Sequence, residues 1–217
     1  MISYHMIIFA IKSYIALVLI FILDKAIIKY NKNGRWFQLH ALCNLIITFC
    51  TFHDVQDCIL YPPKSSEIVP IQYSAFIALM LHIYHCLKFE IRNSDWIHHI
   101  SSVFITTPVF IYYPCKGTSF FLFVGTGLPG AIDYIGLVLY KNNVILKYTQ
   151  KHINTLINTY IRMPGGTICS YLLFKDSIYG NNINILKLFL SIICYCNTTY
   201  YGKQSIQSFE RYKYNML

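Results

Sequence analysis

The chain has 217 residues, of which 55% are hydrophobic and only 12% are charged, and its mean hydropathy is +0.45. About a quarter of the residues of a soluble globular domain are charged, so this composition argues against a soluble protein and predicts a membrane protein. The net charge of +9 does not indicate nucleic-acid binding, because the Lys and Arg residues are scattered and form no block.

Seven apolar runs are close to the length of a membrane span, which takes about 20 residues as a helix. They cover residues 4–23, 36–52, 71–87, 97–113, 119–140, 161–179 and 183–201. We therefore expect an all-α fold, a polytopic transmembrane helix bundle, in which residues 1–217 form a single transmembrane domain. Because the last two runs are the weakest, six spans are the alternative to seven.

Prolines and glycines interrupt several of these runs. Proline removes a backbone donor, so Pro129 is expected to kink or break the fifth span, and Pro164-Gly165-Gly166 to break the sixth. The basic segment 141–162 between them has apolar residues at helical spacing, which predicts an amphipathic helix lying in the membrane interface.

The basic residues also predict how the chain is oriented. Most of the Lys and Arg residues lie in the links after the first, third and fifth runs and in the carboxyl-terminal tail, whereas the link after the second run is net acidic. The positive-inside rule then places the amino terminus on the non-cytosolic side and the carboxyl terminus in the cytosol. Cys58 and Cys115 fall in non-cytosolic loops, where we expect them to form a disulfide if that compartment is oxidising.

Polar residues recur at helical spacing within four of the runs, so several of them share one helix face. They are His40, Asn44 and Thr48 on the second run, His82 and His85 on the third, His98, His99, Ser102 and Thr106 on the fourth, and Asp133 on the fifth. An ionisable residue well inside a span, such as Asp133, is costly unless it is paired and indicates a functional site.

In the predicted orientation, the ionisable members of this set lie within about two turns of the cytosolic ends of their helices. We therefore predict a cluster in the cytosolic leaflet. Its catalytic candidates are His98, His99 and Asp133, and its lipid- or substrate-binding candidates are His40, Asn44, His82, His85, Ser102 and Thr106. The alternative is that each polar side chain only hydrogen-bonds a neighbouring helix.

Three short motifs in this order resemble the TLC domain family, which includes the ceramide synthases. They are Arg35 followed by His40-Ala41, then His98-His99 at the start of a later span, and Asp133 on the next span. The resemblance covers roughly residues 35–201. Ceramide synthases carry a His-Asp-x-Ser-Asp motif after the paired histidines, whereas this chain has Pro129-Gly130-Ala131-Ile132-Asp133 and keeps only the final Asp. The chain therefore looks more like the family members outside that branch.

The resemblance implies lipid handling or lipid acyl transfer at the His/Asp cluster, in the endoplasmic reticulum or another internal membrane. It implies a membrane lipid and an acyl-CoA as candidate partners, and no cofactor. Histidine suits such a site because it can take a proton from an attacking amine or hydroxyl, while a neighbouring carboxylate orients it.

Two other functions remain open. One is a metal or haem protein, ligated by His82-x-x-His85 and His98-His99. The other is a structural or assembly membrane protein without catalysis. The sequence does not decide whether the protein is an enzyme.

Overall fold

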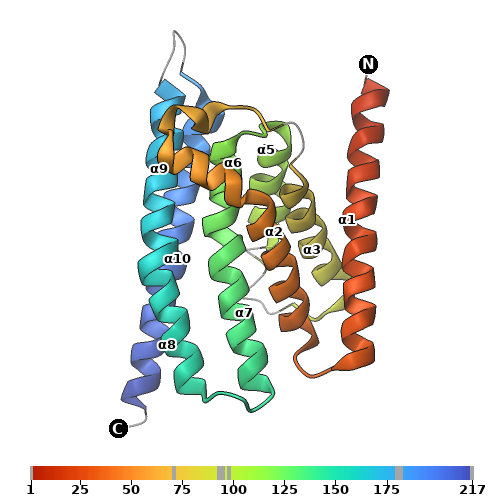
Figure 1. Ribbon diagram of the computed structural model, residues 1–217, viewed down its shortest axis with the longest axis vertical. Coiled ribbons are helices and arrows are strands. Elements are labelled where there is room, and N and C mark those ends of the chain that lie inside the picture. The colour runs from red at the N-terminus through yellow and green to blue at the C-terminus, as the bar shows by residue number, and fades with distance from the viewer. Residues whose placement is uncertain (1, 70–71, 92–95, 97–98, 179–182, 216–217) are drawn as a thin grey trace.

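The computed structural model describes residues 2–69, 72–91, 96, 99–178 and 183–215, and this part of the chain has an all-α fold (Figure 1). The all-α prediction is confirmed. Seven helical columns stand side by side in the described ranges, and successive columns run in opposite directions. In chain order, they are α1 (Ile2–Tyr30); α2 (Arg35–Leu60); α3 (Tyr73–Lys88); η2 (Ser101–Thr106) with α5 (Thr107–Tyr112); α6 (Lys116–Leu122), η3 (Phe123–Gly127) and α7 (Leu128–Lys141); α8 (Lys147–Ile157), η4 (Asn158–Arg162) and α9 (Met163–Ile178); and α10 (Ile185–Tyr214).

The two ends of the bundle are built from different loops. The end that we call the η1 end contains the 3-10 helix η1 (Pro62–Ser66) and the turn before α6. There Lys116 Nζ lies 2.6 Å from Asp57 Oδ2, and the backbone amide of Val69 donates to the carbonyl of Pro114 over 2.9 Å. The end that we call the basic end contains the α1–α2 turn, the α7–α8 turn and the last turns of α10. Asn33 Nδ2 donates to the carbonyl of Lys141 over 2.7 Å, and this bond joins the α1–α2 turn to the α7–α8 turn.

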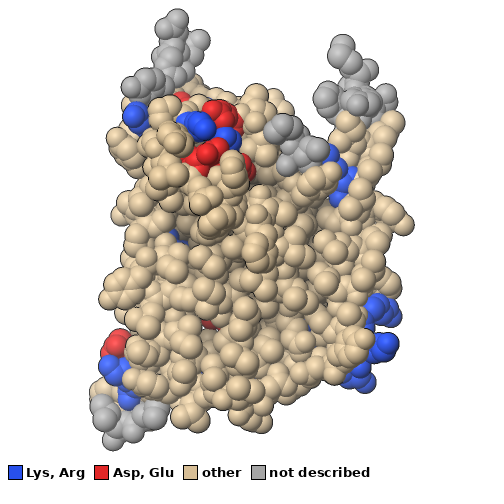
Figure 2. Space-filling model, in the orientation of Figure 1, with Lys and Arg blue, Asp and Glu red and all other residues tan. Residues whose placement is uncertain are grey.

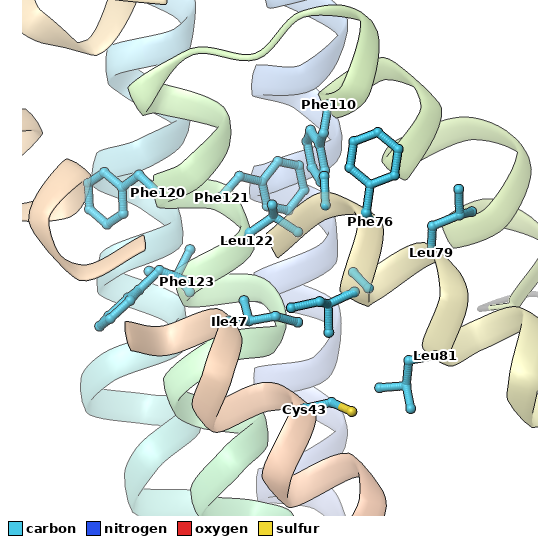
Figure 3. Packing of buried hydrophobic residues seen from close by; sticks show 14 of the residues in the cluster. Cys43, Ile47, Phe76, Leu79, Leu81, Phe110, Phe120, Phe121, Leu122 and Phe123 are labelled. Atoms are coloured by element: carbon cyan, nitrogen blue, oxygen red, sulfur yellow. The ribbon is translucent and has the colours of Figure 1, made fainter. Parts of the chain in front are cut away.

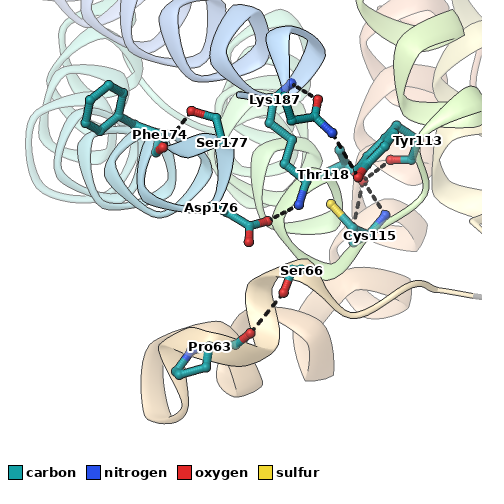
Figure 4. A network of polar contacts seen from close by, with 10 residues as sticks. Pro63, Ser66, Tyr113, Cys115, Thr118, Phe174, Asp176, Ser177 and Lys187 are labelled. Atoms are coloured by element: carbon teal, nitrogen blue, oxygen red, sulfur yellow. Dashed lines mark hydrogen bonds and ion pairs between the residues drawn. The ribbon is translucent and has the colours of Figure 1, made fainter. Parts of the chain in front are cut away.

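Ion pairs and hydrogen bonds also hold the α9–α10 corner at the η1 end (Figure 4). Lys187 Nζ of α10 is paired with Asp176 of α9. Asn184 caps α10 by accepting a hydrogen bond from the backbone amide of Lys187, and its side-chain amide donates to Tyr113 Oη over 3.2 Å. The helices α9 and α10, which correspond to the last two apolar runs, are therefore packed against each other and are joined to the fourth column.

Three π-helical segments occur in the described part of the chain, and each ends two residues before a proline. Pro108, Pro129 and Pro164 are each the second residue of the α-helix that follows η2, η3 or η4. Proline has no amide hydrogen and clashes with the carbonyl four residues earlier, so a normal α-helical turn does not accommodate it. In the wider π turn the backbone bonds skip one residue further, as in the bond from the Leu128 amide to the Phe123 carbonyl. The expected break at Pro164-Gly165-Gly166 is therefore wrong, because the helix continues through a π turn.

The same continuity corrects the prediction for segment 141–162. Instead of forming a separate helix across the membrane interface, α8 runs through η4 directly into α9 and forms the lower part of the sixth column (Figure 1). Gln150 of α8 is buried, whereas Val144 and Leu146, in the turn before α8, are exposed.

The core centres on α2, which packs against α1, α3, α6 and α7. Side chains from α2, α3, α5 and α6 meet there, with Phe110 packed edge-to-face on Phe121 at 5.1 Å between ring centroids (Figure 3). Glycine allows a close helix approach here: a Cβ on Gly130 would lie 2.6 Å from Nδ2 of Asn44, closer than such atoms can come. At this point the backbone of α7 at Gly130 therefore packs directly against the Asn44 side chain of α2.

Two helical stretches in the described ranges, Met6–Tyr30 and Lys116–Lys141, are long and apolar enough to cross a membrane, judged by length and composition alone. Val103–Tyr112 is apolar but shorter. Other columns also turn apolar side chains outward, among them Phe49, Tyr171 and Ile192. On the face seen in Figure 2, charged side chains gather near the two ends of the molecule, with a broad uncharged band between them.

Candidate functional site: a buried histidine cluster

Four of the predicted histidines meet in one buried cluster near the basic end. His40 comes from α2, His82 and His85 come from α3, and His99 lies in the helical turn just before η2; each is 4–6% exposed. The ring centroid of His85 lies 4.6 Å from that of His99 and 6.0 Å from that of His40. His82 lies 5.2 Å from His99. Histidines that are up to 59 residues apart in the sequence thus form one continuous group of rings.

Helical spacing explains how α3 supplies two members. His82 and His85 are three residues apart, so both side chains project from one face of α3. The Nδ1 atom of His82 lies 2.6 Å from the carbonyl oxygen of Ala78, one turn earlier in the same helix. A carbonyl can only accept, so Nδ1 carries the hydrogen of this bond and Nε2 is the basic nitrogen when the ring is neutral. The helix thereby fixes the tautomer of His82.

Trp36 covers the cluster on one side. Its ring centroid lies 3.6 Å from that of His40 and 3.4 Å from that of His85, and it contacts Phe89 at 4.9 Å. Trp36 and Phe89 are both partly exposed. An aromatic residue at the start of an apolar run is typical of the membrane interface, but the spacing of four residues between Trp36 and His40 places both on one helix face.

Tyr134, and not Asp133, is the residue of α7 that reaches the cluster. The Tyr134 ring stacks on His40 with centroids 4.4 Å apart and an interplanar angle of 25°. Asp133 accepts a hydrogen bond from Gln150 Nε2 of α8 over 3.0 Å and interacts electrostatically with Arg162 and Lys151. Neighbouring residues on a helix project about 100° apart, so Asp133 faces α8 while Tyr134 faces α2. The structure therefore does not bring Asp133 together with the histidines.

A different carboxylate, Asp24 of α1, lies beside the cluster. It is 1% exposed, it accepts a hydrogen bond from Arg35 Nε over 2.6 Å, and it accepts another from Tyr84 Oη over 2.6 Å. The Arg35 guanidinium also lies 4.9 Å from the ring centroid of Phe89, which in turn contacts His85. Asp24 was not predicted to belong to the site, because at the end of an apolar run it is indistinguishable from a residue that ends a span.

The remaining candidates have other surroundings. Asn44 is buried against the fifth column, where its Oδ1 accepts a hydrogen bond from Thr126 over 3.1 Å. Thr106 is half-buried in η2. His98 and the side chain of Ser102 lie outside the described residues. The polar stripe of α2 is therefore divided: His40 belongs to the cluster, and Asn44 belongs to the contact between α2 and the fifth column.

Cys58 and Cys115 are both buried at the η1 end and both are free thiols in the structure, so their disulfide stays a prediction. Among the described residues, no three His, Cys, Asp or Glu side chains are grouped as ligands of a metal ion would be.

Comparison of the chain with models of protein families, with curated proteins and with solved structures found no match. The resemblance to the TLC domain family thus rests on the short motifs alone and stays a prediction.

Proposed function

We propose that the chain is an integral membrane protein with seven spans, and that the histidine cluster is a lipid-handling site in its cytosolic leaflet. Two helices of spanning character, outward-facing apolar residues on other columns and charged groups near the ends support the membrane placement. Lys25, Lys29, Lys141, Lys147 and Arg211 all belong to the basic end or to the helix turns beside it, which supports a cytosolic location for that end.

The single observation that carries the functional proposal is the contact between four buried imidazoles from three separate parts of the chain. One buried histidine is easily explained as a helix-to-helix hydrogen bond. Four of them packed ring to ring are harder to explain in that way, because several imidazole nitrogens, each able to donate or accept a proton, are then brought together at one place. Such a group suits proton transfer more than it suits structural bonding.

The aromatic cover fits a lipid substrate. Trp36 and Phe89 are partly exposed at the edge of the cluster, and amphipathic aromatic rings favour the depth at which lipid headgroups meet acyl chains. A lipid could therefore present its amine or hydroxyl to the imidazoles while its chains remain in the bilayer. A membrane lipid is the substrate class that we propose.

Acyl transfer is the reaction that this arrangement could support, in keeping with the TLC resemblance. A neutral histidine would take the proton of the lipid amine or hydroxyl as the new bond to the acyl carbon forms, and the carbon–sulfur bond of an acyl-CoA would break to release the thiol. The proposal differs from the sequence-based one in its partners, since Tyr134 and the Asp24–Arg35 pair stand beside the histidines in place of Asp133.

Lipid analysis of the purified chain tests the proposal. We expect native mass spectrometry, followed by lipid extraction, to find a stoichiometric lipid on the wild-type chain and on a His53→Ala control, which changes an exposed histidine at the η1 end. His85→Ala and His99→Ala variants should lose that lipid while they remain folded. If both variants keep it, the cluster is a structural feature and the proposal fails. Metal and haem content, measured on the same sample, would reveal the oxidoreductase alternative.

A further inference from the structure

A second site lies away from the histidines, in a pocket between α8 and the last turns of α10. Its volume is about 340 Å³, and its lining includes Lys147, Lys151, Ser208, Arg211 and Tyr212. Three of these residues are cationic, and no carboxylate lines the pocket in the described part of the chain. The pocket therefore concentrates positive charge at the basic end of the molecule.

The cations are held close together by specific contacts. Lys151 Nζ donates to Ser208 Oγ over 2.5 Å. The ammonium groups of Lys147 and Lys151 lie 5.3 Å and 5.9 Å from the ring centroid of the same residue, Tyr212. Burial, together with the nearby Lys147 charge, lowers the pKa of Lys151. Two like charges on one ring repel each other, and an anion between them would relieve that repulsion.

Nearby carboxylates compensate this charge only in part, since Asp133 interacts electrostatically with Lys151 from outside the pocket lining. Glu210, on α10 beside the pocket, lies 3.7 Å from Lys213 Nζ. Among the described residues, no carboxylate lies within salt-bridge distance of Lys147, Lys151 or Arg211. The ligand that fits is an anion with several acceptor oxygens, because ammonium, guanidinium, hydroxyl and amide donors all converge on the pocket.

Apolar side chains beside the pocket favour an anion that is part of a lipid. Val144 is 65% exposed and Leu146 is 75% exposed. Both lie in the turn just before α8, which begins at Lys147. A cationic surface flanked by exposed apolar residues is typical of a segment that lies at a membrane interface. Both belong to the α7–α8 turn at the basic end, which is the depth of the membrane surface in the proposed placement.

We propose that the pocket between α8 and α10 binds the phosphate-bearing headgroup of an anionic phospholipid. This inference rests on the proposed membrane placement but not on any chemistry at the histidine cluster. It gives the chain a lipid specificity at the membrane surface that is separate from the lipid-handling site.

Binding of a fluorescent short-chain phosphatidylinositol phosphate to the full chain in neutral detergent micelles tests this proposal. We expect the double variant Lys147→Gln, Lys151→Gln and the single variant Arg211→Gln to bind more weakly, by about fivefold for each charge removed. A double variant Lys29→Gln, Lys32→Gln removes the same charge from the α1–α2 side of the same end and should bind like the wild type. Lys151→Arg keeps the charge and should also keep most of the binding.

Three results would overturn the proposal. Pocket variants that remain folded and bind like the wild type would remove the site altogether. An equal loss in the Lys29, Lys32 control would indicate general surface electrostatics. Competition by inorganic phosphate as effective as that by the unlabelled lipid would indicate a free-anion site and not a lipid site. His85→Ala should leave headgroup binding unchanged, so failure of the lipid-handling proposal would not be mistaken for failure of this one.

Discussion

Asp133 and Tyr134 are neighbours on α7, yet they belong to different parts of the molecule. Asp133 is bonded to Gln150 of α8, whereas Tyr134 stacks on His40 of α2. A helix on the inside of a bundle has partners on several sides, so one residue of difference changes the partner completely. The stacked Tyr134 ring limits rotation of the His40 imidazole, which makes Tyr134 a positioning residue for His40 in the proposed site.

Replacement of the buried residue Asp24 should destabilise the fold. It is almost fully buried and accepts charge-assisted hydrogen bonds from Arg35 and a further bond from Tyr84. We expect Asp24→Asn to lower the free energy of unfolding by about 1.5–3 kcal/mol, because the amide cannot accept the same set of bonds and leaves Arg35 poorly paired. The measurement is an SDS titration of the purified chain in mild detergent.

The control for this prediction is Glu210→Gln, which removes an exposed carboxylate paired with Lys213 one turn away. Surface pairs of that kind contribute little, so a change of no more than about 0.5 kcal/mol is expected. An equal effect of the two substitutions would mean that Asp24 is as weakly coupled as a surface carboxylate.

At the scale of the element, glycines decide where columns approach most closely. A Cβ at Gly130 would lie 2.6 Å from Asn44 Nδ2, whereas a Cβ at Gly136, two turns further along α7, would lie 3.4 Å from the Gln150 side chain, which is an ordinary contact. Both glycines have helical backbone conformations. The two positions therefore differ in packing and not in backbone preference.

Gly130→Ala should consequently lower the free energy of unfolding by about 1–3 kcal/mol, as overpacking of a tight contact does. Gly136→Ala should be neutral or stabilise the chain by up to about 1 kcal/mol, because alanine reduces the freedom of the unfolded chain. Thermal unfolding followed by circular dichroism compares the two. Adding Asn44→Ala to Gly130→Ala should recover part of the loss; no recovery would show that the Asn44 contact is not the cause.

The helices could be predicted from the sequence more fully than the interruptions within them. Spacing of apolar residues predicts an all-helical chain, and the seven runs correspond to the seven columns in the described ranges. Proline indicates a disturbance at Pro129 and Pro164, but a local pattern cannot tell a broken helix from a π turn, because the outcome depends on whether the neighbouring helices keep both halves aligned. Segment 141–162 was misassigned for the same reason.

The candidate site was partly predictable on similar grounds. Helical spacing, together with positions near the helix ends that the positive-inside rule assigns to the cytosol, predicts one depth for His40, His82, His85 and His99. Depth alone does not fix the rotation of a helix about its axis. The choice between Asp133 and Tyr134, and the arrival of Asp24 from α1, depend on that rotation and hence on packing between distant columns.

At the scale of the whole molecule, the odd number of columns has a direct consequence for topology. The amino terminus lies at the η1 end and the carboxyl terminus at the basic end (Figure 1). Hydrogen bonds between the α1–α2 and α7–α8 turns fix these two turns at the same end, as expected if both lie on one side of a membrane. The histidine cluster lies near that end as well.

The seven-span proposal therefore predicts that the two termini face opposite sides of the membrane, with the carboxyl terminus in the cytosol. Epitope tags on each terminus, followed by protease treatment of sealed microsomes, measure this directly. We expect the carboxyl-terminal tag to be digested without detergent and the amino-terminal tag to be protected until detergent is added. With six spans, both tags would lie on the same side. Digestion of the amino-terminal tag alone would show that the orientation is the reverse of the predicted one. The reversed orientation would also place the basic pocket and the histidines in the wrong leaflet for a cytosolic acyl donor.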